Sequence, residues 1–404
     1  MIEIKVRGIM ERLFVYICVT NFLKFLAWSC TNLLYSLFAV SLGAQPAVLG
    51  ILFSILALAR FLTDNPSGML VHRIGRKNAI IIGLGIIAFS YVLFSLAKDA
   101  NSLFVAMSIF GVGWAISDTA SNLYAANIAP TEKRASYMGI FQGMTMIASI
   151  VGPPFGGFIA EIYGLRMSFI TSTLISVAAL LSVLIYLKED RVKEKSEVKE
   201  KKSATLQRYT TVLKDRLLLS LFIAAVLTAF EGPAFRNIAL PVYATQVLGV
   251  SIVELTLIES FTNSANIAVR FFLIRMLEGR FSRRALIIMG HLIRGVSICF
   301  LGLAPEYYAL LALSSLSGLG LGLFSPFVEA LWIDSTTDNE RSLVYGIRNS
   351  FIDFGSIINS NIITLLFGIE IRFPFYFVGL VSILNGYALF WIIGHFKKSL
   401  KANY

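Results

Sequence analysis

Charged residues are scarce in this chain: only 15% of its 404 residues are Asp, Glu, Lys or Arg, whereas 56% are hydrophobic. A soluble globule of this length needs much more polar surface to stay in solution. Together with a mean hydropathy of +0.75, the shortage of charge excludes a soluble protein and predicts one that crosses a membrane several times.

Cysteine is also rare, and nucleotide-binding loops are missing. Cys18, Cys30 and Cys299 all lie in apolar runs, without the spacing of a metal or redox site. The glycine-containing segments 68–75 and 152–157 lack the Gly-Lys-Ser/Thr ending of a phosphate-binding loop. We therefore expect no enzyme activity, no metal, no cofactor and no ATP bound by this chain.

What the sequence does contain is twelve long apolar runs. Each meets the need for about 20 residues to cross a hydrocarbon core about 30 Å thick. Membrane β-barrels are excluded, because their strands alternate apolar and polar residues over about ten positions. We predict an all-α membrane protein with transmembrane helices at residues 14–37, 47–70, 78–97, 103–128, 137–162, 167–187, 217–240, 252–274, 285–303, 309–333, 343–367 and 373–393.

The net charge of +11 comes from cations on one side of the predicted membrane. Of the 35 Lys and Arg residues, 26 lie in the N-terminus, the even-numbered loops and the C-terminal tail, and only Lys98, Arg166 and Arg372 lie in odd-numbered loops. This asymmetry is typical of cytoplasmic loops. We expect a multi-pass protein of the cell membrane with both termini in the cytoplasm, whose basic residues contact anionic lipid and not nucleic acid. The first run is too long for a signal peptide and lacks a cleavage site, so we expect it to remain as a span.

A repeat divides the chain into two halves. The segment His72-Arg73-Ile74-Gly75-Arg76-Lys77 recurs 207 residues later as Gly279-Arg280-Phe281-Ser282-Arg283-Arg284, and Arg134 matches Arg341 at the same offset. Tandem halves of six spans are typical of transporters that rock one half against the other around a central site. We predict two pseudo-symmetric six-helix bundles, residues 1–187 and 217–404, joined by a charge-dense cytosolic linker at 188–216.

The loop after the second span carries an extended motif, which reads Arg60-x-x-x-Asp64-x-Pro66-x-Gly68-x-Leu70-x-His72-Arg73-x-Gly75-Arg76-Lys77. It resembles the loop-2/3 signature of the major facilitator superfamily, and its degenerate copy at 279–284 lies where that family repeats it. The resemblance implies a twelve-helix major facilitator fold and a conformational latch at this loop. Simple anchoring by positive charge is the alternative. The latch residues are Asp64, Gly68, His72, Arg73, Gly75, Arg76, Lys77 and Arg348.

A second motif lies on the fifth span. Its residues are small or bend the helix, which lets two helix backbones approach closely. The motif resembles the antiporter signature of the superfamily's drug exporters, with Ala148 in place of a glycine. The resemblance implies a role in exchange coupling, and ordinary helix packing is the alternative. The motif residues are Gly139, Gly152, Pro153, Gly156 and Gly157.

The latch departs from the family pattern at one position. The family's loop motif normally carries an aspartate where this chain has His72. Asp64 and Arg348 lie at similar depths, about 9 and 8 Å above the cytosolic ends of their spans, and the family's architecture sets these spans against each other. We predict that Asp64 pairs with Arg348 when the cytosolic side is closed, with a local Asp64–Arg60 pair as the alternative.

Charges inside spans point to a transport path, because each costs about 2.5 to 3.5 kcal/mol at the bilayer centre unless water or a partner receives it. Glu231 precedes a Gly-Pro break in the seventh span, and Arg236 is its expected counter-charge. We predict that Asp353 or Glu231 carries a coupling proton.

The eighth span carries a polar stripe on one helix face, which we expect to line the path. Structural pairing is the alternative for any single charged residue. The candidate pathway residues, including this stripe, are Lys24, Asp118, Glu231, Arg236, Glu259, Asn263, Asn266, Arg270 and Asp353.

These features indicate a secondary active transporter that works by alternating access. The fifth-span motif favours proton-coupled export of an amphipathic or hydrophobic small molecule. The runner-up is a proton symporter that imports a polar nutrient such as a sugar, organic anion or peptide, because in-span Arg and Lys residues could hold an anionic group. A non-transporting receptor on the same fold is a third possibility. The family resemblance implies a monomer.

Overall fold

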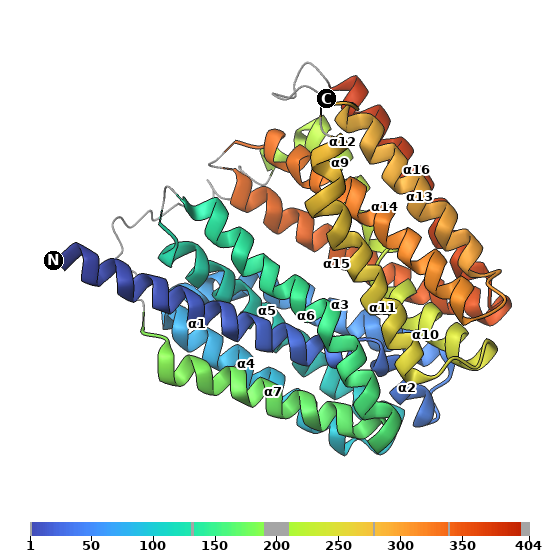
Figure 1. Cartoon of the computed structure of the whole chain (residues 1–404), viewed down its shortest axis with the longest axis horizontal. Helices are drawn as coiled ribbons and strands as arrows, with labels where there is room; N and C mark the ends of the chain where they lie inside the picture. Colours follow the sequence, from blue (N-terminus) through green and yellow to red (C-terminus); the bar gives the residue numbers. More distant parts are fainter. Residues whose placement is uncertain (1, 131–132, 190–209, 278, 338–339, 397–404) are drawn as a thin grey trace. The chain divides into compact units, whose positions relative to one another are not determined.

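The structure is a computed structural model that describes the chain except residues 1, 131–132, 190–209, 278, 338–339 and 397–404. The described residues are almost entirely helical (Figure 1). Contacts divide the chain into two units, residues 1–193 with 251–260, and residues 194–250 with 261–404. Most of the predicted linker lies outside the described residues.

Long helices joined by short turns make up the first unit. Three of the turns use a glycine with positive φ, Gly43 at +85°, Gly75 at +87° and Gly164 at +90°, a conformation that other residues adopt only with strain. Asp99 caps the fifth of these helices by accepting a hydrogen bond from the Ser102 backbone N–H at 2.8 Å. The helices are α1 (Ile2–Thr31), α2 (Leu34–Ser41), α3 (Pro46–Ile74), α4 (Arg76–Leu96), α5 (Ala100–Ile128), α6 (Arg134–Tyr163) and α7 (Leu165–Tyr186).

The second unit contains more interrupted helices. Of the three π-helical turns among its described residues, η2 lies in the predicted seventh span, η3 lies just after that span, and η4 lies in the predicted eighth span. Such turns are frequent at functional sites. The elements from the linker onward are α9 (Arg216–Phe230), η2 (Phe235–Ala239), α10 (Leu240–Val242), η3 (Tyr243–Val247), α11 (Ile252–Ala268), η4 (Val269–Leu273), α12 (Ile274–Leu277), α13 (Arg283–Leu301), α14 (Tyr307–Asp334), α15 (Arg341–Ile369) and α16 (Phe373–His395). The first nine residues of α11 group with the first unit.

Eleven helical segments of the described chain are long and apolar enough to cross a membrane. They correspond to every predicted span except the eighth. That span is continuously helical from Ile252 to Leu277 through α11, η4 and α12. It carries Glu254, Glu259 and Arg270 besides several polar residues, so its composition alone does not mark it as a membrane helix.

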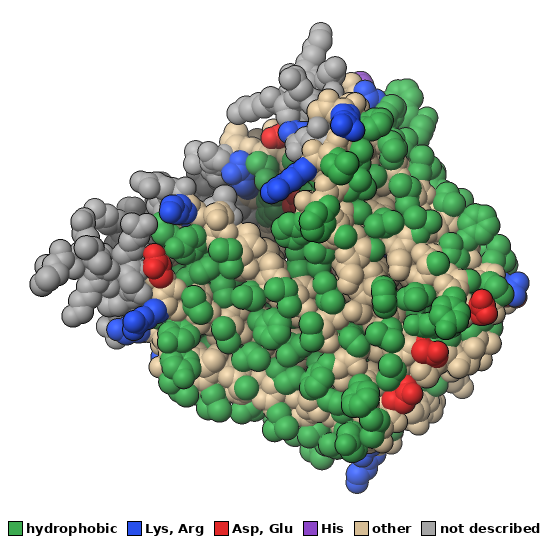
Figure 2. All heavy atoms as spheres, viewed as in Figure 1, with side chains coloured by type: hydrophobic (Ala, Val, Ile, Leu, Met, Phe, Trp, Pro, Cys, Tyr) green, Lys and Arg blue, Asp and Glu red, His purple; other side chains and the backbone are tan. Residues whose placement is uncertain are grey.

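Large apolar side chains point outward from both units. Leu174 of α7 in the first unit and Phe272 of η4 in the second are 66% and 75% exposed, for example. Figure 2 shows hydrophobic side chains covering most of the visible face, with few charged ones among them. A soluble protein rarely leaves such a large continuous apolar surface in water. These side chains therefore face the lipid of a multi-pass membrane protein.

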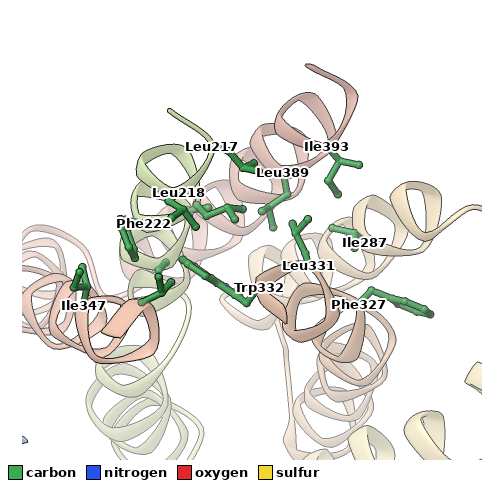
Figure 3. Packing of buried hydrophobic residues seen from close by; sticks show 14 of the residues in the cluster. Leu217, Leu218, Phe222, Ile287, Phe327, Leu331, Trp332, Ile347, Leu389 and Ile393 are labelled. Atoms are coloured by element: carbon green, nitrogen blue, oxygen red, sulfur yellow. The ribbon is translucent and has the colours of Figure 1, made fainter. Parts of the chain in front are cut away.

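Each unit has its own packed core. In the first, the rings of Tyr35, Phe94 and Phe169 lie within 5.0–5.5 Å of one another, joining α2, α4 and α7. In the second, apolar residues of α9, α13, α14, α15 and α16 meet around Phe222 and Trp332, whose rings are 5.5 Å apart (Figure 3). Close packing of this kind holds helices together where lipid supplies no hydrophobic driving force.

The predicted packing motif on α6 divides into two parts. Gly152 and Gly156 lie against α1, where a Cβ at Gly156 would overlap the Cys30 carbonyl and one at Gly152 would overlap the Ser29 side chain. Gly157 packs against the side chain of Thr256, in the segment of α11 that groups with the first unit. A Cβ at Gly139, in contrast, would meet nothing within 4 Å. Close approach therefore requires glycine at the C-terminal positions of the motif only.

The contrast predicts different effects of the same substitution on one helix. Gly156→Ala forces a methyl group onto the α1 backbone and should destabilise the protein by about 1–3 kcal/mol, as overpacking does. Gly139→Ala is the matched control and should leave stability unchanged or slightly raised, because alanine favours helix. Thermal unfolding of the purified variants in detergent checks both, and equal midpoints for the two variants would contradict the packing assignment.

Candidate functional site

Lys24 and Asp118, two of the predicted pathway residues, form an ion pair inside the first unit. The Lys24 Nζ on α1 lies 2.9 Å from the Asp118 Oδ1 on α5. Asn122, one turn later on α5, donates from Nδ2 to the other carboxylate oxygen at 3.2 Å. The Lys24 side chain is 1% exposed, whereas that of Asp118 is 39% exposed. The accessible charge of the pair is therefore the carboxylate.

Aromatic rings surround this pair. The Lys24 Nζ lies 4.8 Å from the ring centre of Phe25 and 5.2 Å from that of Trp114, close enough for cation–π attraction. The rings of Trp28 and Trp114 are 5.6 Å apart, and both side chains are half-buried. The carboxylate of Asp118 thus belongs to the same cluster as three partly accessible aromatic rings.

Glu231, at the end of α9, is the centre of a second buried cluster. Its Oε1 accepts a hydrogen bond from Asn385 Nδ2 at 2.8 Å and lies 3.5 Å from the His291 Nδ1. Its Oε2 accepts from the Ser382 hydroxyl at 2.9 Å and lies 3.4 Å from the Arg294 Nε. His291 and Arg294 of α13 are thus partners that the sequence did not indicate, and the role of Arg236 as a counter-charge stays a prediction.

Side chains from neighbouring helices also satisfy the helix break that follows Glu231. Pro233 has no N–H to donate to the Ala229 carbonyl, four residues earlier. Asn359 of α15 donates to this carbonyl at 3.4 Å and to that of Phe230 at 3.2 Å. The Arg294 Nη2 donates to the Glu231 carbonyl at 2.9 Å. The carbonyls that the break was predicted to expose are therefore bonded within the second unit.

The polar stripe of the eighth span is partly tied to its own unit. Arg270 donates from Nε to the Asn266 Oδ1 at 2.9 Å and from Nη2 to the Ser325 hydroxyl of α14 at 2.7 Å. Glu259 is buried and Asn263 is half-buried. Asp353, on α15, is also buried, at 3% exposure. Exposure of this stripe to a transport path stays a prediction.

The predicted latch residues lie around the junction of α3 and α4. His72 and Arg73 are exposed at the end of α3, and Gly75 turns the chain into α4. Lys77 donates from Nζ to the Leu184 carbonyl near the end of α7, at 3.3 Å. A Cβ at Gly75 would overlap the Glu189 carboxylate, whereas one at Gly68 would meet nothing within 4 Å. The φ of +87° at Gly75 therefore requires glycine there, whereas nothing at Gly68 does.

Arg348, predicted as a latch partner, forms a bidentate ion pair in its own unit. Its Nη2 and Nη1 donate to the two carboxylate oxygens of Glu329 at 2.6 and 3.0 Å. Tyr345 donates to the same carboxylate at 3.3 Å. The pairing of Arg348 with Asp64, which is also half-buried, stays a prediction for a closed state.

The 207-residue repeat relates the two clusters. Glu231 lies 207 residues after Lys24, and Glu329 lies 207 residues after Asn122. Equivalent positions of the two halves therefore carry a buried cation in the first unit and a buried anion in the second. Each charge is neutralised by partners from its own unit.

Sequence reasoning missed three members of the Glu231 cluster, namely His291, Ser382 and Asn385. His291 and Arg294 are three residues apart on α13, and Ser382 and Asn385 are three residues apart on α16, so each pair shares a helix face. Polar residues three apart in an apolar span are the sequence pattern that could have identified these residues. The pattern does not show which helices pack against each other.

An almost entirely helical chain with eleven described segments able to cross a membrane is a polytopic membrane protein. Comparison with known families agrees: the model of the Major Facilitator Superfamily matches residues 17–278 and 234–402. The chain therefore belongs to the major facilitator superfamily. It is a membrane transporter and not an enzyme.

Two relatives are drug-resistance proteins. The chain is 25% identical to Multidrug resistance protein 1 of Bacillus subtilis (strain 168) over 352 residues, covering 84% of this chain and 85% of that protein. It is 24% identical to Multidrug resistance protein 2 of the same organism over 351 residues, covering 85% and 86%. A POT family transporter of known structure aligns with a TM-score of 0.78 at 13% identity, covering 97% and 96% of the two chains. That structure supports the fold alone.

The Lys24–Asp118 pair makes a prediction about stability. Asp118→Asn leaves the Lys24 ammonium buried without its carboxylate. Losing a partner from a buried pair costs about 3–5 kcal/mol, and because Asp118 is partly exposed we expect a smaller loss, about 1–3 kcal/mol. The double variant Lys24→Met/Asp118→Asn should recover much of it, since no buried charge remains.

Asp99→Asn is the matched control, because Asp99 is an exposed residue that caps the same helix and asparagine caps equally well. Unfolding midpoints of the four proteins in detergent measure the coupling. A double variant less stable than Asp118→Asn alone would show that the pair is not the interaction that Asn removes.

Proposed function

We propose that this protein is a proton-coupled exporter of amphipathic or hydrophobic small molecules. The observation that carries the proposal is the similarity to two Bacillus multidrug resistance proteins over more than four-fifths of the chain. The proposal places the protein in the cell membrane as a monomer with both termini in the cytoplasm, in line with its cytoplasmic excess of Lys and Arg.

The first unit supplies features suited to an amphipathic ligand. A ligand that reaches the Lys24–Asp118 pair meets the carboxylate first, because the ammonium is buried. The half-buried rings of Phe25, Trp28 and Trp114 offer apolar contact beside it. Flat aromatic compounds with a positive or hydrogen-bond-donating group match this combination of stacking surface and carboxylate.

The second unit supplies a buried ionisable cluster separate from these rings. Glu231, His291 and Arg294 are all buried on α9 and α13. In the membrane interior such groups are kept at a cost and mark proton or ion pathways. In this proposal, the first unit holds the substrate and the second unit holds the proton.

Import of an anionic nutrient receives less support. The alternative rested on in-span cations that could bind an anionic group. Three of these cations, Lys24, Arg294 and Arg348, already pair with carboxylates of their own units. An anionic substrate would have to displace those carboxylates, which favours the export reading.

Transport by purified protein in vesicles tests the proposal. With the vesicle interior acidic, proton efflux through the protein should drive accumulation of ethidium, a flat aromatic cation, and a protonophore should abolish it. Absence of ethidium movement with the gradient in either direction would overturn the proposed function.

A tryptophan substitution tests the binding surface. Trp114→Ala removes a ring next to Lys24 and should weaken apparent ethidium affinity about tenfold, equivalent to about 1.4 kcal/mol. Trp391→Ala is the matched control, because Trp391 lies 60% exposed on the outer face of α16. We expect the control to keep wild-type affinity, and equal losses in both variants would argue against an aromatic site at Trp114.

A further inference from the structure

His291 is the one histidine of the three in this chain that is buried. Its side chain is fully buried on α13, whereas His72 and His395 are exposed. The imidazole stacks on the Phe324 ring of α14, with centres 3.7 Å apart and planes 17° apart. Gly386 of α16 packs against it so closely that a Cβ there would lie 2.5 Å from the His291 Cβ. The ring is therefore held in one orientation.

The hydrogen bonds around His291 indicate its tautomer. Nδ1 lies 3.5 Å from the Glu231 Oε1 and 3.4 Å from the Ser382 hydroxyl. The single Ser382 proton is donated to Glu231 at 2.9 Å, so the hydroxyl can only accept from the imidazole. Both neighbours of Nδ1 are thus acceptors, and the neutral ring carries its proton on Nδ1.

The other ring nitrogen is left with an open lone pair. In the described part of the chain, the His291 Nε2 is buried and has no hydrogen-bond partner. In the neutral tautomer this nitrogen is an acceptor. A buried polar atom without a partner is uncommon and calls for an explanation. The Nε2 lone pair is therefore available to take up a proton.

The Glu231 carboxylate already has partners for both of its oxygens. Its two oxygens already accept from Asn385 and Ser382, and Arg294 lies 3.4 Å from one of them. Protonating the carboxylate would weaken its attraction to Arg294 and turn an accepting oxygen into a donor. Protonating His291 at Nε2 leaves every one of these contacts in place.

We infer that His291 is the proton-binding residue of the Glu231 cluster, with the proton added at Nε2 while Nδ1–H stays directed at Glu231. The inference rests on the proposed proton-coupled export and names the group that would carry the proton. The cluster changes from Glu⁻, Arg⁺ and neutral His, with no net charge, to a net charge of +1. The proton comes from and returns to water, and no other bond is formed or broken.

The groups that face His291 set the balance of this protonation. Glu231 favours the imidazolium, and Arg294 opposes it. The residues that face the ring or share its carboxylate from α14 and α16, namely Phe324, Ser382 and Asn385, do not titrate. Because His291 is fully buried, its proton can exchange with water only in a conformation that admits water to the cluster. Protonation is therefore linked to conformation, which coupled transport requires.

Transport with a single substitution separates the role of His291 from the proposed function. His291→Gln keeps a polar side chain but cannot bind the proton. We expect it to retain exchange of ethidium across vesicles without a gradient and to lose accumulation driven by the proton gradient at least tenfold. His395→Gln, at the exposed end of α16, is the matched control and should retain both activities.

The transport assay distinguishes failure of the His291 assignment from failure of the proposed proton coupling. Gradient-driven accumulation by wild type and by His291→Gln alike would overturn the inference and leave the proposed export intact. Ethidium movement by wild type that ignores the proton gradient would overturn proton coupling itself.

A measurement on the wild-type protein decides the matter even where the variant fails to fold. With ¹⁵N-histidine, nuclear magnetic resonance distinguishes neutral imidazole from imidazolium at each nitrogen. His72→Gln and His395→Gln variants assign the two exposed residues by difference. We expect the remaining ring to change from the Nδ1–H form to the imidazolium over the pH range that drives transport. A ring that stays neutral throughout that range would refute the inference.

Discussion

A charge inside a helix bundle surrounded by lipid must be neutralised by another part of the protein, and this constraint organises both units. The buried ammonium of Lys24 brings α1 and α5 together through Asp118. The buried carboxylate of Glu231 brings the end of α9 together with α13 and α16. Removing either charge would leave its partners unsatisfied, so these residues hold helices in a defined register where apolar packing alone is tolerant.

The sequence was sufficient for the fold and insufficient for the pairing of charges. Length and hydropathy located eleven of the predicted spans, and the loop motif indicated the family. The eighth span was predicted although its composition resembles that of a polar helix, because its polar residues recur at helical spacing on one face. For Glu231, the Gly-Pro break marked an unusual position, but proximity in sequence suggested Arg236. The partners that the structure shows lie 60 or more residues away, and only the packing of α13 and α16 brings them to the carboxylate.

The same limit applies to the glycine motif on α6. All of its glycines look equivalent in the sequence, yet a side chain at Gly152 or Gly156 would collide with α1, whereas one at Gly139 would meet nothing within 4 Å. A motif shows which positions are small, and the neighbouring helix determines which of them need to be. Similarly, the repeat predicted two related halves, but it did not show that the same position would carry a cation in one half and an anion in the other. That exchange of sign makes the two units chemically different despite their shared fold.

The break in the seventh span affects how the second unit can move. The backbone carbonyls at the break accept hydrogen bonds from Asn359 and Arg294. The Glu231 carboxylate accepts hydrogen bonds from Ser382 and Asn385, so three other helices contact the break. A proline break in isolation would act as a hinge. Here, bending at the break would disrupt several hydrogen bonds at once in a place that water does not reach, so the segment is braced and not flexible. A conformational change would then bend the chain at other positions, and the broken helix would move together with α13, α15 and α16 as a rigid body.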